Sequence, residues 1–361
     1  MAVPLRQQLA LAAYLLRQRL RGRTRFPLVV ELEPLFACNL ACAGCGKIQH
    51  PPEILRRRMS VEQAVAAVEE CGAPVVSIAG GEPLIHPEIH LIVRALLRRR
   101  RWVYLCTNAL LMRRKMALFE PSPRFAWAVH LDGLGEEHDR SVCQDGVFEE
   151  AVAAIREAKR RGFRVTTNST IFTHHRAERV RALLDFLNDE LGVDGMMISP
   201  AYAYPTAPDQ DHFPGVEETR RLFAPLLRDP GSRRWRLNHT PLYLDFLAGQ
   251  VDLECTPWGI PCYTIFGWQR PCYLQADGYV ATYRELVETT DWSRYGRRSG
   301  NPRCANCMAH CGYEPTAVLA TARSLRQGLR ALAAAGRRPP EGRGGSPGRS
   351  PVPAAPTRRP G

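Results

Sequence analysis

Three cysteines near the start of the chain have a spacing that suits an iron–sulfur cluster. Cys38, Cys42 and Cys45 follow the pattern Cys-x3-Cys-x2-Cys. Thiolates are the usual ligands of such clusters, and three of them can hold one face of a four-iron cube, leaving one iron open to another molecule. The alternatives are a zinc loop with a distant fourth ligand and a chance spacing. The position of the triplet directly after a predicted strand argues against both.

A second motif, Gly80-Gly81-Glu82-Pro83, follows the next predicted strand. Glycines let a backbone approach a ligand closely, and the Glu82 carboxylate can accept hydrogen bonds from an amino group. Alone, the motif would be an ordinary turn. After the cysteine triplet and at a strand end, it supports the same site.

The elements that must position these motifs alternate along the chain. Short β-branched runs end in polar corners, and each leads into an amphipathic helical stretch. We expect strands at 29–34, 74–80, 102–108, 125–133, 163–169 and 193–199, and helices near 60–71, 86–99, 110–119, 146–161 and 176–190. Such repeats form a parallel sheet covered by helices, with its chemistry at the C-terminal ends of the strands.

Together the two motifs resemble the radical S-adenosylmethionine (SAM) superfamily over about residues 28–200. The resemblance implies an α/β fold, a partial (β/α)6 barrel with a Cys-rich C-terminal extension. It implies a [4Fe–4S] cluster on the cysteine triplet, with SAM on the open iron and Gly80, Gly81 and Glu82 around the methionyl amine. It also implies SAM contacts at later strand ends, where an ordinary structural hydrogen bond is the alternative for each residue: Thr107, Asn108, His130, Asp132, Asn168, Ser169 and Ser199.

A closer resemblance covers about residues 1–318. LEPLFACNLACAGCGKI, VYLCTNALL and CANCMAHCGYE are similar to segments of the hopanoid-associated radical SAM proteins, the adenosylhopane synthases. This implies that SAM is consumed as a co-substrate and that its adenosyl radical adds to diploptene, a membrane triterpene, in hopanoid biosynthesis. A flavodoxin or ferredoxin would donate electrons. Cys262 departs from the family pattern.

Cys106 ends the third predicted strand, directly before Thr107 and Asn108. Addition of a carbon radical to a 1,1-disubstituted alkene leaves a tertiary radical, and a thiol can end the reaction by giving it a hydrogen atom. From position alone, a buried cysteine acting as a small hydrophobic residue is the more ordinary interpretation. The family resemblance also implies the donor, which we favour.

A second cysteine group, Cys304-x2-Cys307-x3-Cys311, is nearly the reverse of the first. It predicts an auxiliary iron–sulfur cluster or a zinc site, with Cys272 as the fourth ligand. A set of reduced, buried cysteines is the alternative.

The net charge of +13 is concentrated at the two ends. Residues 1–25 carry six arginines and no acid, and residues 336–361 carry six arginines and one glutamate, so the body holds only +2. This argues against nucleic-acid binding and favours ends that meet an anionic surface. A basic amphipathic helix at 5–20 can lie on a membrane or pack on the barrel. We expect a cytoplasmic protein, peripheral on the inner face of the membrane.

The expected organisation has five segments: a basic helix at 1–27, the core barrel at 28–200, a Cys- and aromatic-rich region at 201–318, a short helix at 319–335 and a disordered tail at 336–361. Aromatic residues between 200 and 275 can line an apolar pocket or form core. Two other functions stay open. One is a radical SAM maturase of peptides or glycans with an auxiliary cluster, and the other is a non-enzymatic, membrane-attached metal-binding protein.

Overall fold

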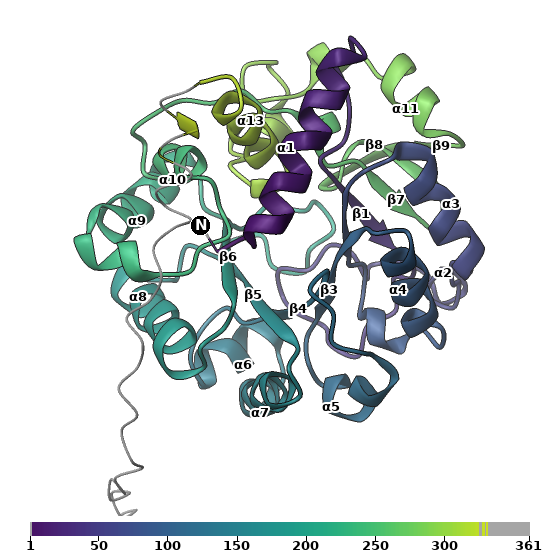
Figure 1. Ribbon diagram of the computed structural model, residues 1–361. Coiled ribbons are helices and arrows are strands. Elements are labelled where there is room, and N and C mark those ends of the chain that lie inside the picture. The colour runs from purple at the N-terminus through teal and green to yellow at the C-terminus, as the bar shows by residue number, and fades with distance from the viewer. Residues whose placement is uncertain (1, 325–326, 329, 331–361) are drawn as a thin grey trace, which may run out of the picture.

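A computed structural model describes residues 2–324, 327–328 and 330. Its centre is one nine-stranded sheet in the order β6-β5-β4-β3-β2-β1-β7-β8-β9 (Figure 1). The tail predicted at 336–361 and part of the helix predicted at 319–335 lie outside the described residues.

Six parallel strands match the six that the sequence predicts. They are β1 (Val29–Glu33), β2 (Val75–Ile78), β3 (Trp102–Thr107), β4 (Phe125–His130), β5 (Arg164–Ile171) and β6 (Gly195–Pro200). Each strand pairs in parallel with the next, so all six C-terminal ends meet at one edge. The predicted α/β class, with a parallel sheet and a C-terminal extension, is confirmed.

Helices cover the outside of the parallel strands (Figure 1). They are α2 (Pro52–Leu55), α3 (Val61–Cys71), α4 (Ile89–Arg98), α5 (Met112–Lys115), α6 (Glu136–Val142), α7 (Val147–Arg160) and α8 (Ala177–Asp185). In α4 the apolar positions Ile89, Ile92, Val93 and Leu96 are buried, as helical spacing requires. The short α6 was not among the predicted helices.

The C-terminal region adds three strands to the same sheet. β7 (Cys262–Thr264) runs parallel to β1, and β8 (Gly267–Cys272) and β9 (Gln275–Val280) follow in antiparallel order. Helix α11 (Tyr283–Thr289) packs on β8 of this extension, whereas α9 (Val216–Arg228) packs on α8 and α10 (Pro241–Leu247) lies between α9 and α13. The last helices are α12 (Pro302–Ala305) and α13 (His310–Thr321). Residues on both sides of the predicted boundary at 200 therefore share one sheet.

Helix α1 (Leu5–Leu20) has one face packed on the barrel and one face exposed. Tyr14 donates a hydrogen bond to the carbonyl oxygen of Pro27 at 2.7 Å, and Tyr104 of β3 donates to Gln7 Oε1 at 2.8 Å. The opposite face leaves four leucines exposed, Leu5, Leu9, Leu16 and Leu20. Among the residues that the structure describes, no helix is long and apolar enough to span a membrane.

Candidate active site

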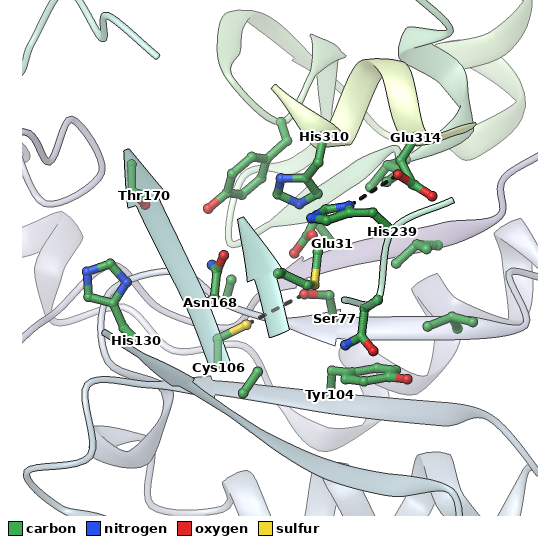
Figure 2. A pocket seen from close by; sticks show the side chains of 18 of the residues that line it. Glu31, Ser77, Tyr104, Cys106, His130, Asn168, Thr170, His239, His310 and Glu314 are labelled. Atoms are coloured by element: carbon green, nitrogen blue, oxygen red, sulfur yellow. Dashed lines mark hydrogen bonds and ion pairs between the residues drawn. The ribbon is translucent and has the colours of Figure 1, made fainter. Parts of the chain in front are cut away.

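A cavity of about 690 Å³ extends from the edge where the parallel strands end, along the inside of the sheet, to the starts of β1 and β2. Its walls come from the loop after β1, inward-facing residues of β1 to β6, helix α1 and part of α13. Figure 2 shows side chains from several strands pointing into this space. The topology therefore gathers groups that are far apart in sequence around one volume.

The three cysteines of the first triplet all line this cavity. The N–H of Cys45 donates to the carbonyl oxygen of Cys42 at 3.1 Å, which turns the loop back on itself. Burial raises the pKa of the Cys38 thiol to about 11 and raises that of Cys42 further, and neighbouring thiols add to both effects. Iron would remove this penalty, because a cationic centre stabilises the thiolate form.

This donor set fits a cluster better than a single ion. Within the described ranges, no three Cys, His, Asp or Glu side chains converge closely enough to ligate one metal ion. In a four-iron cube each thiolate binds a different iron, so its ligands need not converge on one point. Three thiols on one cavity wall satisfy that requirement.

The two glycines of the Gly-Gly-Glu-Pro turn allow contact with the cysteine loop. A Cβ at Gly80 would overlap the carbonyl oxygen of Leu35, and a Cβ at Gly81 would overlap that of Ala37. Gly80 also has a φ of 104°, which disfavours any side chain. Both glycines line the cavity. The close approach that we expected toward a ligand is made first to the backbone of the cluster loop.

Glu82 is buried, and both of its carboxylate oxygens have partners in the chain. Oε1 accepts from Leu84 N at 3.0 Å and from Thr107 Oγ1 at 2.9 Å, and Oε2 accepts from Asn108 N at 2.8 Å. Burial raises the pKa of Glu82 to about 7, although these bonds oppose the shift. Glu82 thus ties the end of β2 to the end of β3, and its predicted contact with the methionyl amine stays a prediction.

Asn108 connects β3 to the cysteine loop. Its Nδ2 donates to Asn39 Oδ1 at 2.9 Å and lies 3.8 Å from Cys38 Sγ. The hydroxyl of Thr107 is used within the chain, since it donates to Glu82 and accepts from Ala109 N at 3.0 Å. Asn108 therefore holds the cluster loop directly, while Thr107 holds Glu82, and both residues also reach the cavity wall.

The half-buried His130 and the buried Asp132 form a pair at the end of β4. His130 Nε2 lies 2.9 Å from Asp132 Oδ2, and Asp132 also accepts from Ser141 Oγ at 2.6 Å and from Thr170 N at 2.7 Å. Burial opposes ionisation of both groups, but their attraction outweighs it, so the pKa of Asp132 is lowered and that of His130 is raised. Both side chains line the cavity, where the pair can meet a polar ligand.

The strand-end residues of β5 and β6 are divided between the cavity and the core. Asn168 lines the cavity, but Ser169 does not, and its hydroxyl donates to the carbonyl oxygen of Leu131. Successive side chains of a strand point to opposite faces, so Thr170 occupies the cavity wall instead. Ser199 is buried, bonds to Pro200 O and lies outside the cavity lining. The geometry thus argues against SAM contacts by Ser169 and Ser199.

Cys106 faces the cavity from β3. Its Sγ lies 3.7 Å from the hydroxyl oxygen of Ser77 on β2, drawn as a dashed line in Figure 2. Burial raises the pKa of Cys106 to about 12, with a further contribution from the carboxyl of Glu31. The residue therefore remains a protonated thiol near neutral pH. Sequence reasoning missed Ser77 and Glu31, although the period-two pattern of β1 and β2 could have indicated both.

The second cysteine group gathers in the C-terminal extension. Cys304 Sγ accepts from Gln275 Nε2 at 3.1 Å, and burial raises the pKa of Cys272 to about 11 and that of Cys307 to about 12, with neighbouring thiols contributing. The pKa of Cys311 is likewise raised by burial and by nearby thiols. Cys255 lies near this group, since Cys307, Cys272 and Cys304 add to the rise in its pKa that burial causes. Within the described residues, these cysteines also do not converge closely enough to ligate one metal ion. The second metal site therefore stays a prediction.

Two family models match the chain in succession. One, described as the radical SAM superfamily, matches residues 32–187, and one described as a domain of unknown function, DUF3463, matches residues 196–331. Residues 32–187 of the chain thus form a radical SAM domain. Its cofactors are accordingly a [4Fe–4S] cluster and SAM, and the fit of the cysteine loop described above agrees with this assignment.

Curated relatives of this radical SAM protein align over less than half of its length. Pre-heme d1 synthase of Dinoroseobacter shibae is 28% identical over 170 residues, covering 45% of this chain and 40% of that protein. The subtilosin biosynthesis protein AlbA of Bacillus subtilis is 27% identical over 176 residues, covering 45% of this chain and 39% of that one. The chain thus spans less than half of the length of these relatives.

Solved structures support the fold over a longer range. Streptococcus suis SuiB bound to SAM has a TM-score of 0.57 at 16% identity, covering 70% of this chain and 61% of that one. A structure of anSMEcpe with bound AdoMet has a TM-score of 0.58 at 16% identity, covering 86% and 95%. At this identity the likeness establishes the shared fold.

Proposed function

We propose that this radical SAM enzyme is an adenosylhopane synthase, which joins the adenosyl group of SAM to the exocyclic double bond of diploptene. The observation that carries the proposal is the position of the Cys106 thiol in a largely apolar cavity beside the cysteine triplet. When bound, the cluster and SAM supply the 5′-deoxyadenosyl radical. The residues of the chain then have to admit a hydrocarbon, orient it and end the reaction.

The walls of the cavity suit a substrate without hydrogen-bonding groups. Helix α1 contributes Leu11, Ala12 and Leu15, and the start of β1 adds Leu28 and Val29. A polycyclic hydrocarbon binds by burying apolar surface. His130 of β4 and Asn168 of β5 add polar groups to the lining, where they are available to the nucleoside part of SAM.

Cys106 has the properties of a hydrogen-atom donor. Addition to the alkene leaves a tertiary carbon radical, and the S–H bond of Cys106 can supply one hydrogen atom to it. The raised pKa of the thiol keeps that hydrogen in place. A thiolate at the same position would have none to give.

We extend the proposal to the cellular location. Four of the five large hydrophobic side chains that are exposed in the described residues lie on α1, at Leu5, Leu9, Leu16 and Leu20. Arginines are interspersed with them and follow the helix. This combination favours an anionic membrane surface, which is also where a triterpene substrate is found.

A second candidate is a peptide maturase. Similarity to known proteins supports this candidate more strongly than the shape and lining of the cavity do. AlbA is a bacteriocin biosynthesis protein, Mycobacterium ulcerans MftC is a mycofactocin maturase, and one SuiB structure holds a precursor peptide. The gathered cysteines of the C-terminal extension are compatible with this candidate. An extended peptide, however, would need polar partners for its backbone groups, and the α1 wall offers few.

Product analysis separates the candidates. Full-length protein, reconstituted anaerobically with iron and sulfide, is incubated with SAM, a low-potential reductant and diploptene in anionic liposomes. We expect a mass corresponding to an adenosyl adduct of the triterpene, and no product of any kind from Cys42→Ala. Release of 5′-deoxyadenosine without an adduct would reject the synthase and favour the maturase.

A further inference from the structure

Cys106, Ser77 and Glu31 form a row across three adjacent strands. Glu31 of β1 is the register partner of Ser77 of β2, and paired residues of neighbouring strands project to the same face. Ser77 Oγ in turn lies 3.7 Å from Cys106 Sγ of β3. All three side chains line the cavity, and Figure 2 shows Ser77 between the other two.

We propose that this row is a proton relay that restores the Cys106 thiol after each turnover. The proposal rests on the role of Cys106 in the proposed function. When Cys106 gives a hydrogen atom to the carbon radical, a C–H bond forms, the S–H bond breaks and a thiyl radical remains. One electron from a reductant of the flavodoxin or ferredoxin class and one proton then regenerate the thiol. The proton passes from the Glu31 carboxyl to Ser77 Oγ while the Ser77 hydroxyl proton passes to Cys106, and Glu31 is reprotonated by water.

The surroundings of Cys106 require the proton to accompany the electron. An electron alone would leave a thiolate in a buried position, and burial disfavours that charge. The described part of the chain gives Cys106 a single hydrogen-bonding side chain, Ser77. A proton supplied within the protein must therefore come through that hydroxyl.

Glu31 is suited to hold the proton. Its carboxyl is buried, and the nearby cation Lys47 forms its ion pair with Glu33, at 3.2 Å, instead. Burial raises the pKa of Glu31 to about 8, and the charge of Glu33 adds to this shift while Ser77 and Lys47 oppose it. Four other titratable groups interact electrostatically with Glu31: Cys106, Cys262, Tyr273 and Cys311. All four are acids whose pKa is raised, so none of them supplies a positive charge that would favour ionisation of Glu31.

Single and multiple turnovers distinguish the relay from the earlier steps. Protein in which Cys106 starts as a thiol completes one addition without the relay. Each later turnover depends on the relay to restore that thiol. We expect Glu31→Gln and Ser77→Ala to match wild type in the first turnover and to fall by about a hundredfold in later ones, as for loss of a positioned proton donor. Ser77→Thr, which keeps the hydroxyl, should restore most of the rate. Glu70→Gln is the matched control, since Glu70 accepts from Trp268 Nε1 at 2.8 Å outside the cavity.

A spectroscopic measurement on the protein without cluster or SAM tests the contact itself. The Raman S–H band of Cys106 is isolated by subtracting the spectrum of Cys106→Ala. It should shift to higher frequency in Ser77→Ala and stay unchanged in Glu70→Gln. Wild-type multiple-turnover rates in Glu31→Gln, or an unshifted band in Ser77→Ala, would overturn the relay. Absence of any adduct in the first wild-type turnover would instead reject the proposed function, and the relay with it, whatever the Raman result.

Discussion

The N–H of Glu82 donates to the carbonyl oxygen of Ala37 at 2.9 Å, which bonds the Gly-Gly-Glu-Pro turn to the loop of the cluster cysteines. Gly81 N makes a second such bond, to Leu35 O at 3.1 Å. The turn therefore shapes the cysteine loop in addition to lining the cavity. A substitution that distorts the turn should therefore lower the iron content of the protein, which can be measured independently of catalysis.

Gly81→Ala is expected to lower the iron content of the reconstituted protein to less than about half of the wild-type value, because its Cβ would overlap the Ala37 carbonyl. Iron and sulfide per chain, together with the visible absorption of the cluster, are the measurements. Gly215→Ala is the control, since a Cβ there would stand at an ordinary 3.7 Å from Asn306 Oδ1. A Gly81→Ala protein with full iron content would show that the turn does not shape the site.

Cys106→Ala and Cys106→Ser should still cleave SAM but give little adenosylhopane, or a product with altered configuration at the new centre. Neither variant carries an S–H bond, and neither changes the cluster loop. Liquid chromatography with mass spectrometry measures 5′-deoxyadenosine and adduct in the same sample. Cys143→Ala, a change at an exposed cysteine, is the control. Normal yield and configuration in the Cys106 variants would rule out this residue as the donor.

Asp132→Asn should lower the free energy of unfolding by about 2–3 kcal/mol, because a buried acceptor of three hydrogen bonds loses its charge. It should also lower the pKa of His130, which the carboxylate now raises against the effect of burial. Anaerobic urea denaturation and an NMR titration of His130 measure the two effects. Asp209→Asn is the control because it changes an exposed His–Asp pair, with His212. An unchanged His130 pKa would contradict the pairing.

Glu31 should make the protein less stable as the pH rises. Its folded pKa of about 8 exceeds the unfolded value of 4.5, so the folded state binds the extra proton. The resulting stabilisation is complete below the unfolded pKa and is lost as the pH rises through the folded pKa. Urea denaturation of metal-free protein at about pH 5 and about pH 9 should show this decline, and Glu31→Gln should flatten it. If the free energy of unfolding fell equally with pH in wild type and Glu31→Gln, the proton responsible would belong to a group other than Glu31.

The outer face of α1 should mediate membrane binding. The double substitution Leu16→Gln and Leu20→Gln changes side chains that are 59% and 80% exposed and do not line the cavity, so the fold should be kept while flotation with anionic liposomes falls severalfold. Leu118→Gln is the matched control, because Leu118 is 44% exposed on another part of the surface. Removal of α1 is a poorer test, since its inner face forms part of the cavity. Equal flotation of all variants would remove the membrane proposal.

Local patterns predicted the parallel half of the fold closely. The apolar runs at β1 to β6 and the helix at 5–20 depend on side-chain periodicity along a short stretch, which a sequence displays directly. The extension was less predictable. β7 contains only three residues, Cys262–Thr264, and becomes a strand because β1 offers it an open edge. Long-range pairing of that kind has no local signal.

The sequence by itself determined the chemistry of the protein. Residue type and spacing alone are enough to identify the cluster motif, Cys38, Cys42 and Cys45, and the Gly-Gly-Glu-Pro turn. The tertiary structure decided which polar groups share the cavity. It directed Asn168 inward and Ser169 into the core, gave Glu82 partners within the chain and set Glu31 beside Ser77 and Cys106. The physical reason is that strand register and the alternation of side chains fix which face a residue occupies, and register depends on contacts between distant parts of the chain.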